Sequence, residues 1–329
     1  MWARRETSRG AERGRWRGAW GGVGRPLAAL VSAALIASVA AAAAAQDVFQ
    51  RSVQRADTTA CATEDEVAAY ADRWLNRRPA RALGVDGDLD DAFCTQELLV
   101  DRLRLTLGEP IGYVVGLTSD ETQALFNTDR PIRGVALEGM LLDNDAAVPE
   151  RFGYWPFIEA DLLIVVGSEK INQARTPLEV LRHVRAVRPF IGLVDIGVDP
   201  REPVTPITLT AQNTGARFGV LGRAIPLEPT EASVRMLAEL EVTLESADGA
   251  VLSKATGESI LGNPLNSVLW LIEEGVTLKR GEMVNLGSFG LLSPASAAKG
   301  RAVATYRGLP GAPQVRVRLT PASAAAPKP

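Results

Sequence analysis

Apolar positions recur at helical spacing in the segment that precedes residue 110. Residues 64–78 place apolar side chains three or four positions apart, and residues 89–107 repeat this pattern. The sequence Gly108-Glu109-Pro110 ends the second stretch, because glycine caps a helix and proline cannot continue one. The pattern therefore predicts two helices ahead of a sheet.

The segments after residue 110 are mostly short apolar runs separated by turn residues, which is typical of strands. The predicted strands are residues 113–117, 134–142, 158–166, 190–194, 283–286, 302–306 and 315–319. Apolar residues also alternate on both sides of Asp248-Gly249, which predicts a hairpin of residues 239–245 and 251–255. Further helices are predicted at residues 177–187 and 263–274.

Two carboxylates interrupt the apolar run of residues 155–163. Glu159 and Asp161 are two residues apart, so in a strand both side chains point to the same face. Two anions on a half-buried strand need a cation or strong hydrogen bonds, since each raises the pKa of the other. A divalent metal site is one interpretation. The other is a strand whose polar face is in contact with water.

The N-terminus has the pattern of a secretory signal. Residues 1–25 hold seven Arg and two Glu, and an apolar, alanine-rich stretch at residues 27–45 ends in small residues before Gln46-Asp47. We expect a signal peptide at residues 1–45, cleavage near Ala45, and a periplasmic or other extracytoplasmic location. A retained membrane anchor and a mistaken upstream start are the alternatives, so membrane contact is expected only if the leader is uncleaved.

Removal of this leader makes the chain more acidic. The whole chain carries −3 and residues 1–45 carry +5, so the remaining part of about 284 residues carries −8. An acidic chain without a basic stripe is a poor nucleic-acid binder, and we expect no nucleic-acid partner. The remaining length is enough for one large domain. The sequence leaves open whether the chain forms a homo-oligomer.

The chain contains two cysteines and a single histidine. Cys61 and Cys94 would form one disulfide in an oxidising compartment, and two separate buried thiols are the alternative. His183 lies on the charged side of the helix predicted at residues 177–187, so we expect it at the surface. No Ser-His-Asp set, Cys/His metal spacing or glycine-rich phosphate loop is evident.

Several short segments carry a family resemblance through their order and spacing. They are residues 91–96 (Asp-Ala-Phe-Cys-Thr-Gln), 112–119 (Gly-Tyr-Val-Val-Gly-Leu-Thr-Ser), the Glu159/Asp161 strand, 189–195 (Pro-Phe-Ile-Gly-Leu-Val-Asp), 212–215 (Gln-Asn-Thr-Gly) leading to 220–222, 262–266 (Gly-Asn-Pro-Leu-Asn) and 286–288 (Leu-Gly-Ser). From about residue 90 to 320 the chain resembles the 2-keto-4-pentenoate hydratase and 4-oxalocrotonate decarboxylase branch of the fumarylacetoacetate hydrolase superfamily.

The resemblance implies an α+β fold: a mixed β-sheet roll of the fumarylacetoacetate hydrolase C-terminal type with an N-terminal helical segment. We expect a linker at residues 46–62 and a hydratase-like domain at residues 63–322. Within this domain, residues 63–110 form the helical lead-in and residues 111–322 the roll. The alanine- and proline-rich tail at residues 323–329 is expected to be disordered.

The resemblance also implies a metal site that this chain changes. In the family, three carboxylates hold Mg²⁺ or Mn²⁺, which chelates a small 2-oxo acid; two come from an E-x-E strand and one from a P-A-L-E-x-x-D segment. Glu159 and Asp161 fall on the first two positions, whereas Gly192 falls on the third. The family's lysine in G-Y-K-V-G-L-T-S is replaced by Val114, so no catalytic residue is assigned.

Other polar residues match family motif positions. Asn213 and Ser288 would contact a bound carboxylate, or else satisfy backbone groups of their own turns. Glu138 matches a position that is often acidic near the site, and would either help the metal or be an ordinary strand-end carboxylate. Asp195 lies three residues after Gly192, on the opposite face of a regular strand, which makes it a weak substitute ligand.

Two hypotheses of function follow. The first is an exported, divergent hydratase-like protein: a metal-dependent carbon–oxygen lyase or decarboxylase for small 2-oxo or 2-hydroxydienoic acids, with an impaired site. The second is a non-catalytic pseudoenzyme that binds a small carboxylate or a protein partner. Substitution at two separate site positions favours the second hypothesis. Retention of Glu159, Asp161, Asn213 and Ser288 favours the first.

Overall fold

Two helices precede the first strand, as the apolar spacing predicts. In the computed structural model, which describes residues 61–321, α2 spans Glu64–Leu75 and α3 spans Leu89–Leu107. Capping boxes begin both helices, because Thr63 and Asp88 accept from backbone N–H groups that have no partner within the helix. Gly108, at φ +81°, ends α3.

Three expectations fall outside the described residues: the leader at residues 1–45, most of the linker at 46–62, and the tail at 323–329. Residues 61–321 belong to one compact unit. Within residues 61–321, no helix has the length and apolar character needed to cross a bilayer.

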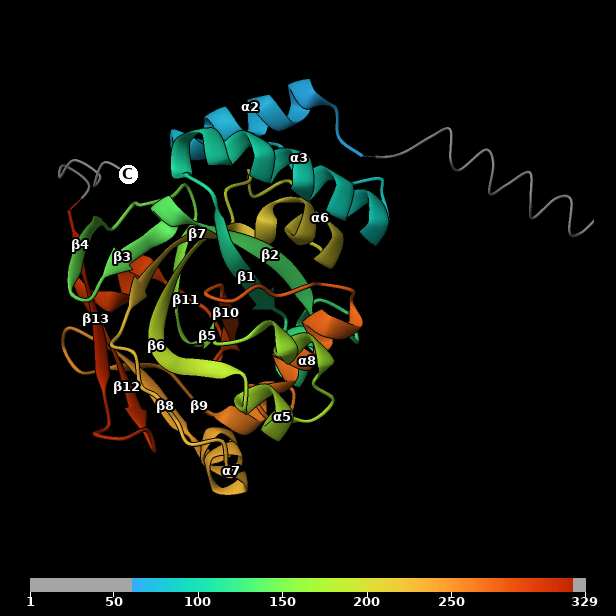
Figure 1. Cartoon of the computed structure of the whole chain (residues 1–329). Coiled ribbons are helices and arrows are strands. Elements are labelled where there is room, and N and C mark those ends of the chain that lie inside the picture. Colours follow the sequence, from blue (N-terminus) through green and yellow to red (C-terminus); the bar gives the residue numbers. More distant parts are fainter. Residues whose placement is uncertain (1–60, 322–329) are drawn as a thin grey trace, which may run out of the picture. The chain divides into compact units, whose positions relative to one another are not determined.

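The strands form two sheets, both with parallel and antiparallel neighbours (Figure 1). The larger sheet has the order β2-β1-β10-β5-β6-β7-β3, with β11 paired to β5. Its strands are β1 (Pro110–Gly116), β2 (Ile132–Leu137), β3 (Leu141–Asp143), β5 (Pro156–Val166), β6 (Val184–Asp195), β7 (Ala216–Leu221), β10 (Met283–Ser288) and β11 (Ser293–Pro294). The longest pair, β5 and β6, lies at its centre and runs antiparallel.

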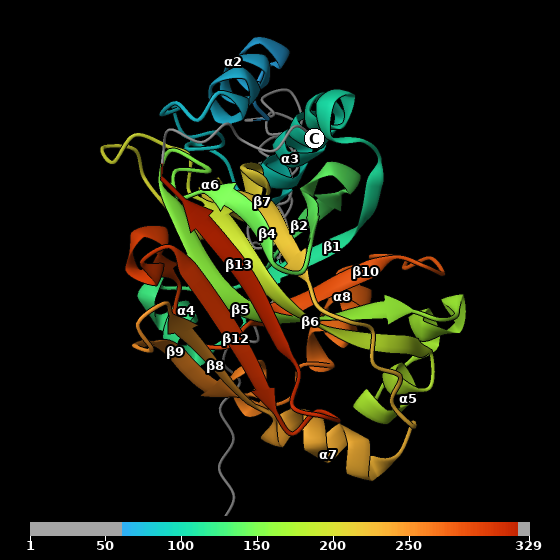
Figure 2. The same cartoon turned by 90° about the vertical axis from the view of Figure 1, so that its left-hand side faces the viewer.

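The smaller sheet has the order β4-β13-β12-β8-β9. Its strands are β4 (Ala146–Pro149), β8 (Glu241–Ser246), β9 (Val251–Thr256), β12 (Arg301–Arg307) and β13 (Gln314–Thr320). Figure 2 shows β13, β12, β8 and β9 side by side in front of β5 and β6. The main apolar core lies between these two layers and includes Ile164, Ile191 and Leu244.

Short helices cover the ends of the larger sheet. They are α4 (Asp120–Leu125), α5 (Pro177–Leu181), α6 (Pro206–Ala211), α7 (Glu231–Glu239) and α8 (Asn266–Glu273). Figure 1 shows α6 beside α2 and α3 at one end, while α5, α7 and α8 gather at the other. The first group encloses a second apolar core that includes Trp74, Leu103 and Leu137.

Two predicted boundaries are wrong. The strand expected at residues 134–142 is broken by a 3₁₀ turn, Glu138–Met140, because the chain there crosses the end of α3. A Cβ on Gly139 would lie 3.0 Å from the carbonyl oxygen of Leu107. The helix expected at residues 177–187 ends at Leu181, since the valine-rich segment from Val184 pairs with β5 and continues as β6.

Tyr306 of β12 joins the two sheets at the middle of the β5–β6 pair. Its buried hydroxyl lies 2.6 Å from the carbonyl oxygens of both Asp161 and Phe190, and it accepts from the Phe190 N–H at 3.1 Å. Asp161 and Phe190 are directly opposite each other in the β5–β6 register. One phenol therefore fixes the backbone beneath this cross-strand pair.

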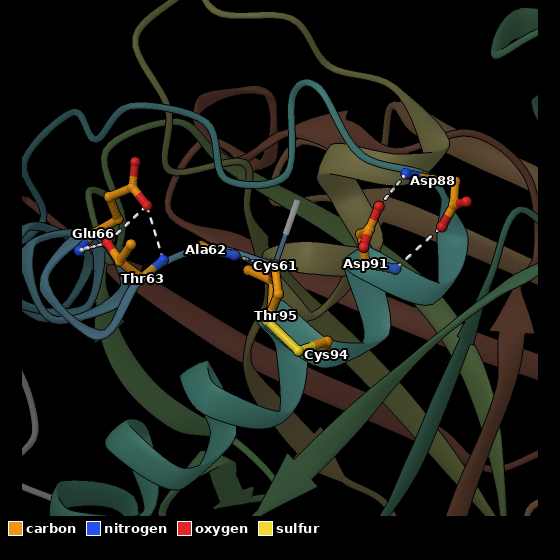
Figure 3. The surroundings of a disulfide bond; sticks show 8 residues. All are labelled: Cys61, Ala62, Thr63, Glu66, Asp88, Asp91, Cys94 and Thr95. Atoms are coloured by element: carbon orange, nitrogen blue, oxygen red, sulfur yellow. Dashed lines mark hydrogen bonds between the residues drawn. A yellow bond between two sulfur atoms is a disulfide. The ribbon is translucent and has the colours of Figure 1, made fainter. Parts of the chain in front are cut away.

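The predicted disulfide between Cys61 and Cys94 is present (Figure 3), with Cα atoms 5.6 Å apart. Beside it, the Ala62 N–H donates to the Thr95 hydroxyl oxygen at 2.9 Å. Together these two links hold the segment before α2 against α3.

We expect the disulfide to stabilise the fold, because it closes a loop across a sequence separation of 33 residues. A loop of this length contributes about 3–4 kcal/mol in the chain-entropy model. Replacing both Cys61 and Cys94 by alanine should lower the free energy of unfolding by about that amount in urea titrations. Intact-mass measurement should find no alkylatable thiol before reduction and two afterwards. Two alkylatable thiols in the native, oxidised protein would contradict the bridge.

Candidate active site

The two carboxylates of β5 occupy one face of the most buried strand pair. In the β5–β6 register Glu159 is opposite Gly192 and Asp161 is opposite Phe190, and on the other side of β5 Asp161 is opposite Ser288 of β10. Asp161 is fully buried, while Glu159 is partly exposed to a cavity. The period of two along the strand therefore brings Glu159 and Asp161 together as predicted.

Asn285 of β10 binds the second carboxylate. Its side-chain amide donates to Asp161 Oδ2 at 2.8 Å, and its own oxygen accepts from the Gly287 N–H at 3.0 Å. That second bond fixes which end of the amide faces Asp161. Asp161 Oδ1 is buried and has no hydrogen-bond donor among the described residues, and Asp161 is not among the residues that line the cavity.

Burial dominates the electrostatics of the pair. It raises the pKa of Glu159 to about 7, an effect that hydrogen bonding to Ser288 and Asp161 opposes. Burial, followed by the charge of Glu159, raises the pKa of Asp161 well above its usual range. The described residues contain no group of three or more His, Cys, Asp or Glu side chains placed to hold a metal.

Gly192 faces this pair, and the family resemblance assigns the third carboxylate to its position. A Cβ built on Gly192 would lie 2.6 Å from Asp161 Oδ2 and 2.8 Å from Glu159 Oε1. The two carboxyl groups thus occupy the space into which a side chain at residue 192 would project. Their ends are flexible, so they could rotate aside for a larger residue.

Val114 brings an apolar side chain to the position that the resemblance assigns to a lysine. It lies on β1 opposite Asn285 in the parallel β1–β10 register, and β10 separates β1 from the carboxylate strand β5. Val114, Glu159, Gly192, Asn285 and Ser288 all line one cavity of about 660 Å³. The two substituted positions and the retained residues therefore belong to a single site.

Asp195 has a structural role. Its buried carboxylate accepts from Arg217 Nη1 at 3.1 Å and from the backbone N–H groups of Trp155 and Gly197. Arg217 also donates to the carbonyl oxygen of Trp74, and its guanidinium lies 4.2 Å from the centre of the Trp74 ring. Asp195 therefore joins β6 to α2 through Arg217 and is no substitute ligand.

Asn213 and Glu138 do not serve the site as proposed from the sequence. The Asn213 amide bonds both the N–H and the carbonyl oxygen of Val135, at 2.6 and 2.8 Å, so it ties its turn to β2. Glu138 is exposed and accepts from the Glu109 N–H beside the end of α3. Neither residue lines the cavity.

Ser288 stays in the site, whereas His183 lies elsewhere. The Ser288 hydroxyl donates to the Gly290 carbonyl oxygen at 2.9 Å and lies close enough to Glu159 to lower the pKa of that carboxylate. His183 follows α5, is partly exposed, and is not among the residues that line the cavity.

Sequence reasoning missed Asn285 and Thr214. Asn285 is a polar residue inside a predicted apolar strand, and that mismatch was the available signal. Thr214 lines the cavity within a turn in which Asn213, Thr214 and Gly215 all have positive φ. Left-handed backbone at non-glycine residues is strained and tends to occur at functional sites, but a sequence does not reveal it.

Comparison with known proteins finds relatives of this chain. The chain is 28% identical to 2-keto-4-pentenoate hydratase of Paraburkholderia xenovorans over 217 residues, which are 64% of this chain and 78% of that protein. It is also 28% identical to the Burkholderia vietnamiensis hydratase over 226 residues, 67% of this chain and 83% of that protein. The chain is thus a divergent relative of these 2-keto-4-pentenoate hydratases. No family model matches it.

A solved structure agrees with this membership at the level of fold. The 4-oxalocrotonate decarboxylase from Pseudomonas putida G7, complexed with magnesium and adipate, has a TM-score of 0.66 at 23% identity, covering 79% of this chain and 99% of that one. This likeness confirms the predicted α+β roll of the fumarylacetoacetate hydrolase superfamily. The hydratase relatives support a hydratase-like function for this hydratase homologue.

The raised pKa of Glu159 gives a signed prediction for stability in metal-free buffer. Between the ordinary value of 4.5 and about 7, the folded hydratase homologue keeps a proton that the unfolded chain has lost, so its stability falls as pH rises. Glu159→Gln should therefore raise the free energy of unfolding at pH 8 by about 1–3 kcal/mol and change it little at pH 4.

Urea titrations at both pH values measure this difference. Glu258→Gln, which changes an exposed carboxylate of the smaller sheet's 3₁₀ turn Gly257–Ser259, is the matched control and should be neutral at both pH values. If Glu159→Gln raises the free energy of unfolding equally at pH 4 and pH 8, the ionised form of Glu159 does not destabilise the folded protein.

Proposed function

We propose that this chain binds a small 2-oxo or 2-hydroxydienoic acid through a divalent cation, Mg²⁺ or Mn²⁺, held by Glu159 and Asp161. In this proposal it is an impaired, metal-dependent lyase that hydrates or decarboxylates its ligand slowly. The observation that carries the proposal is that Glu159, Asp161 and Gly192 meet on one face of the β5–β6 pair, where Glu159 and Gly192 line the cavity and Asp161 is buried behind them.

The residues present fit a weakly held hard cation. Glu159 and the unpartnered Asp161 Oδ1 offer carboxylate oxygens, the ligand type that Mg²⁺ and Mn²⁺ prefer, and Mg²⁺ retains several waters in most protein sites. When bound, such an ion would polarise the 2-oxo group of the acid as a Lewis acid. Asn285 orients Asp161, and Ser288 lies beside Glu159.

The charges of the cavity explain why an acid would need the cation. Among the described lining residues, Arg217 is the one side chain with a positive charge, and it is paired with Asp195. A carboxylate ligand would therefore meet Glu159 without a free counter-charge, and like charges at short range in a dry site repel strongly. A divalent ion between the ligand carboxylate and Glu159 would attract both groups and so offset their repulsion.

A non-catalytic binding protein is the second candidate, and Val114 is the observation that favours it. The residue at the family's lysine position is apolar, and no lysine or histidine is found among the described residues that line the cavity. Proton transfer would then depend on water or on the carboxyl pair itself. A protein that keeps the site but lacks a donor would bind the acid without turnover.

Export is part of the proposal. The Arg-rich leader and the small residues before Gln46 support it, and a disulfide between Cys61 and Cys94 suits an oxidising compartment. N-terminal sequencing of protein recovered from the cell envelope should begin near Gln46 or Asp47. Soluble cytoplasmic protein that retains Met1 would refute export.

Metal binding tests the site directly. Calorimetric titration with Mn²⁺ or Mg²⁺ should find binding at micromolar to millimolar concentrations, and Glu159→Ala should abolish it. Gly192→Glu should strengthen the affinity on the order of tenfold by supplying a third carboxylate, once the two existing ones rotate aside. Gly192→Gln is the matched control, since it adds the same bulk without the charge.

Turnover separates the two candidate functions. Val114→Lys combined with Gly192→Glu should produce measurable hydration of a 2-hydroxy-2,4-dienoate, followed by loss of its conjugated ultraviolet absorbance. Fast hydration by the unmodified protein would show that the missing lysine and carboxylate are dispensable here. An unchanged metal affinity in Gly192→Glu would show that residue 192 does not serve a metal.

A further inference from the structure

The cavity is much larger than the smallest acids of the proposed class. A five-carbon 2-hydroxydienoate has about eight non-hydrogen atoms, whereas cavities of roughly 300–1,000 Å³ enclose drug-sized ligands. The cavity of this chain measures about 660 Å³. A five-carbon acid held at Glu159 and Asp161 would leave most of that space unfilled.

Glycines and an aromatic ring shape the floor beside the carboxylates. Gly192 on β6 and Gly219 on β7 are directly opposite each other, so no side chain rises from either position. A Cβ built on Gly219 would lie 1.6 Å from Phe190 Cζ, which means that the Phe190 ring lies directly on the β7 backbone. The floor next to Glu159 is therefore an aromatic surface over bare backbone.

Apolar side chains also surround the opening. Leu125 of α4, Trp155 before β5 and Leu291 after β10 all line the cavity, and they are 69%, 39% and 39% exposed. The described residues include six large apolar side chains that are exposed. Three of these six, each from a different segment, lie at the rim of this cavity. Exposed apolar residues that gather at one place mark a binding surface.

Charge is nearly absent from the rest of the lining. Of the described lining residues, Glu159 and Arg217 are the ionisable ones, and Arg217 is paired with buried Asp195. A second carboxylate at the far end of a ligand would therefore find no free cation. Its desolvation would be uncompensated, which disfavours dicarboxylic acids.

We propose that the ligand is a monocarboxylic 2-oxo acid with an apolar tail, an alkyl chain or an aryl group well beyond five carbons. This inference rests on the proposed function, because the acid group is held at the Glu159–Asp161 cation. The tail lies over Phe190 and leaves along Leu125, Trp155 and Leu291.

Calorimetry on the full chain with saturating Mg²⁺ tests the tail. The probes are 2-oxopentanoate, 2-oxohexanoate, 2-oxooctanoate and the dicarboxylate 2-oxoadipate. Affinity should rise about threefold to fourfold for each added methylene. 2-Oxoadipate should bind at least tenfold more weakly than 2-oxohexanoate, which has the same chain length.

Two exposed leucines provide a matched pair of variants. Leu125→Gln on the rim should reduce the gain for 2-oxooctanoate several-fold and leave 2-oxopentanoate unchanged. Leu105→Gln alters a leucine of α3 that is 73% exposed and does not line the cavity, so it should change neither affinity. Size-exclusion chromatography of both variants tests the competing occupant of the rim, a second copy of this chain.

The outcomes separate this inference from the proposed function. The apolar tail is refuted if Mg²⁺ binds but the affinity for the acids does not depend on chain length. It is also refuted if 2-oxoadipate binds more tightly than 2-oxohexanoate. Neither result would refute the metal site. A change of oligomeric state in Leu125→Gln without a change in affinity also overturns the apolar tail. Chain-length dependence without any Mg²⁺ effect supports the tail and refutes the metal site, and no binding of any acid refutes both.

Discussion

Two carboxyl groups share one face of the central, buried strand of this protein, and no cation among the described residues accompanies them. That constraint accounts for much of what surrounds them. Burial raises the pKa of Glu159 and of Asp161, and the Asn285 amide satisfies one oxygen of the more buried group. Gly192 leaves the space in which both carboxyl groups fit. A buried carboxyl pair of this kind is stabilised by binding either a proton or a metal ion. Without a lysine at residue 114 and a carboxylate at residue 192, the pair has no strong preference between the two.

The fold holds this pair in place from beneath and from one end. Tyr306 reaches across from the smaller sheet and bonds the backbone of Asp161 and of its cross-strand partner Phe190. At the end of β6, the Asp195–Arg217 pair ties the larger sheet to α2, whose leading segment the disulfide joins to α3. The carboxylates therefore lie on backbone that is fixed from the opposite sheet and from the helical layer. Such a rigid support favours a defined ligand geometry.

The sequence predicted the parts of the structure that local chemistry decides. Capping residues and glycine fix α3 at residues 89–107, and the period of two along β5 places Glu159 and Asp161 on one face. The interest of Gly192 came only from a family resemblance, and its register opposite Glu159 was not predicted. Contacts between distant segments were beyond reach: Asn285 meets Asp161 from 124 residues away, and the close approach of Gly139 to α3 breaks a strand that its own residues favour. The sequence left Asp195 as a weak substitute ligand, because its partner Arg217 lies on another strand and could not be predicted.

Two of the differences that the family resemblance implies replace a charged residue of one cavity. The resemblance assigns a lysine to the position of Val114 and a carboxylate to that of Gly192, and in this chain Phe190 and the leucines of the rim give the same cavity an apolar surface. In a drier site each remaining charge costs more to keep, so the proposed weak binding of a metal and the proposed preference for an apolar ligand have the same cause. Both proposals then follow from one physical trend, the replacement of charge by apolar surface around the strand that carries Glu159 and Asp161.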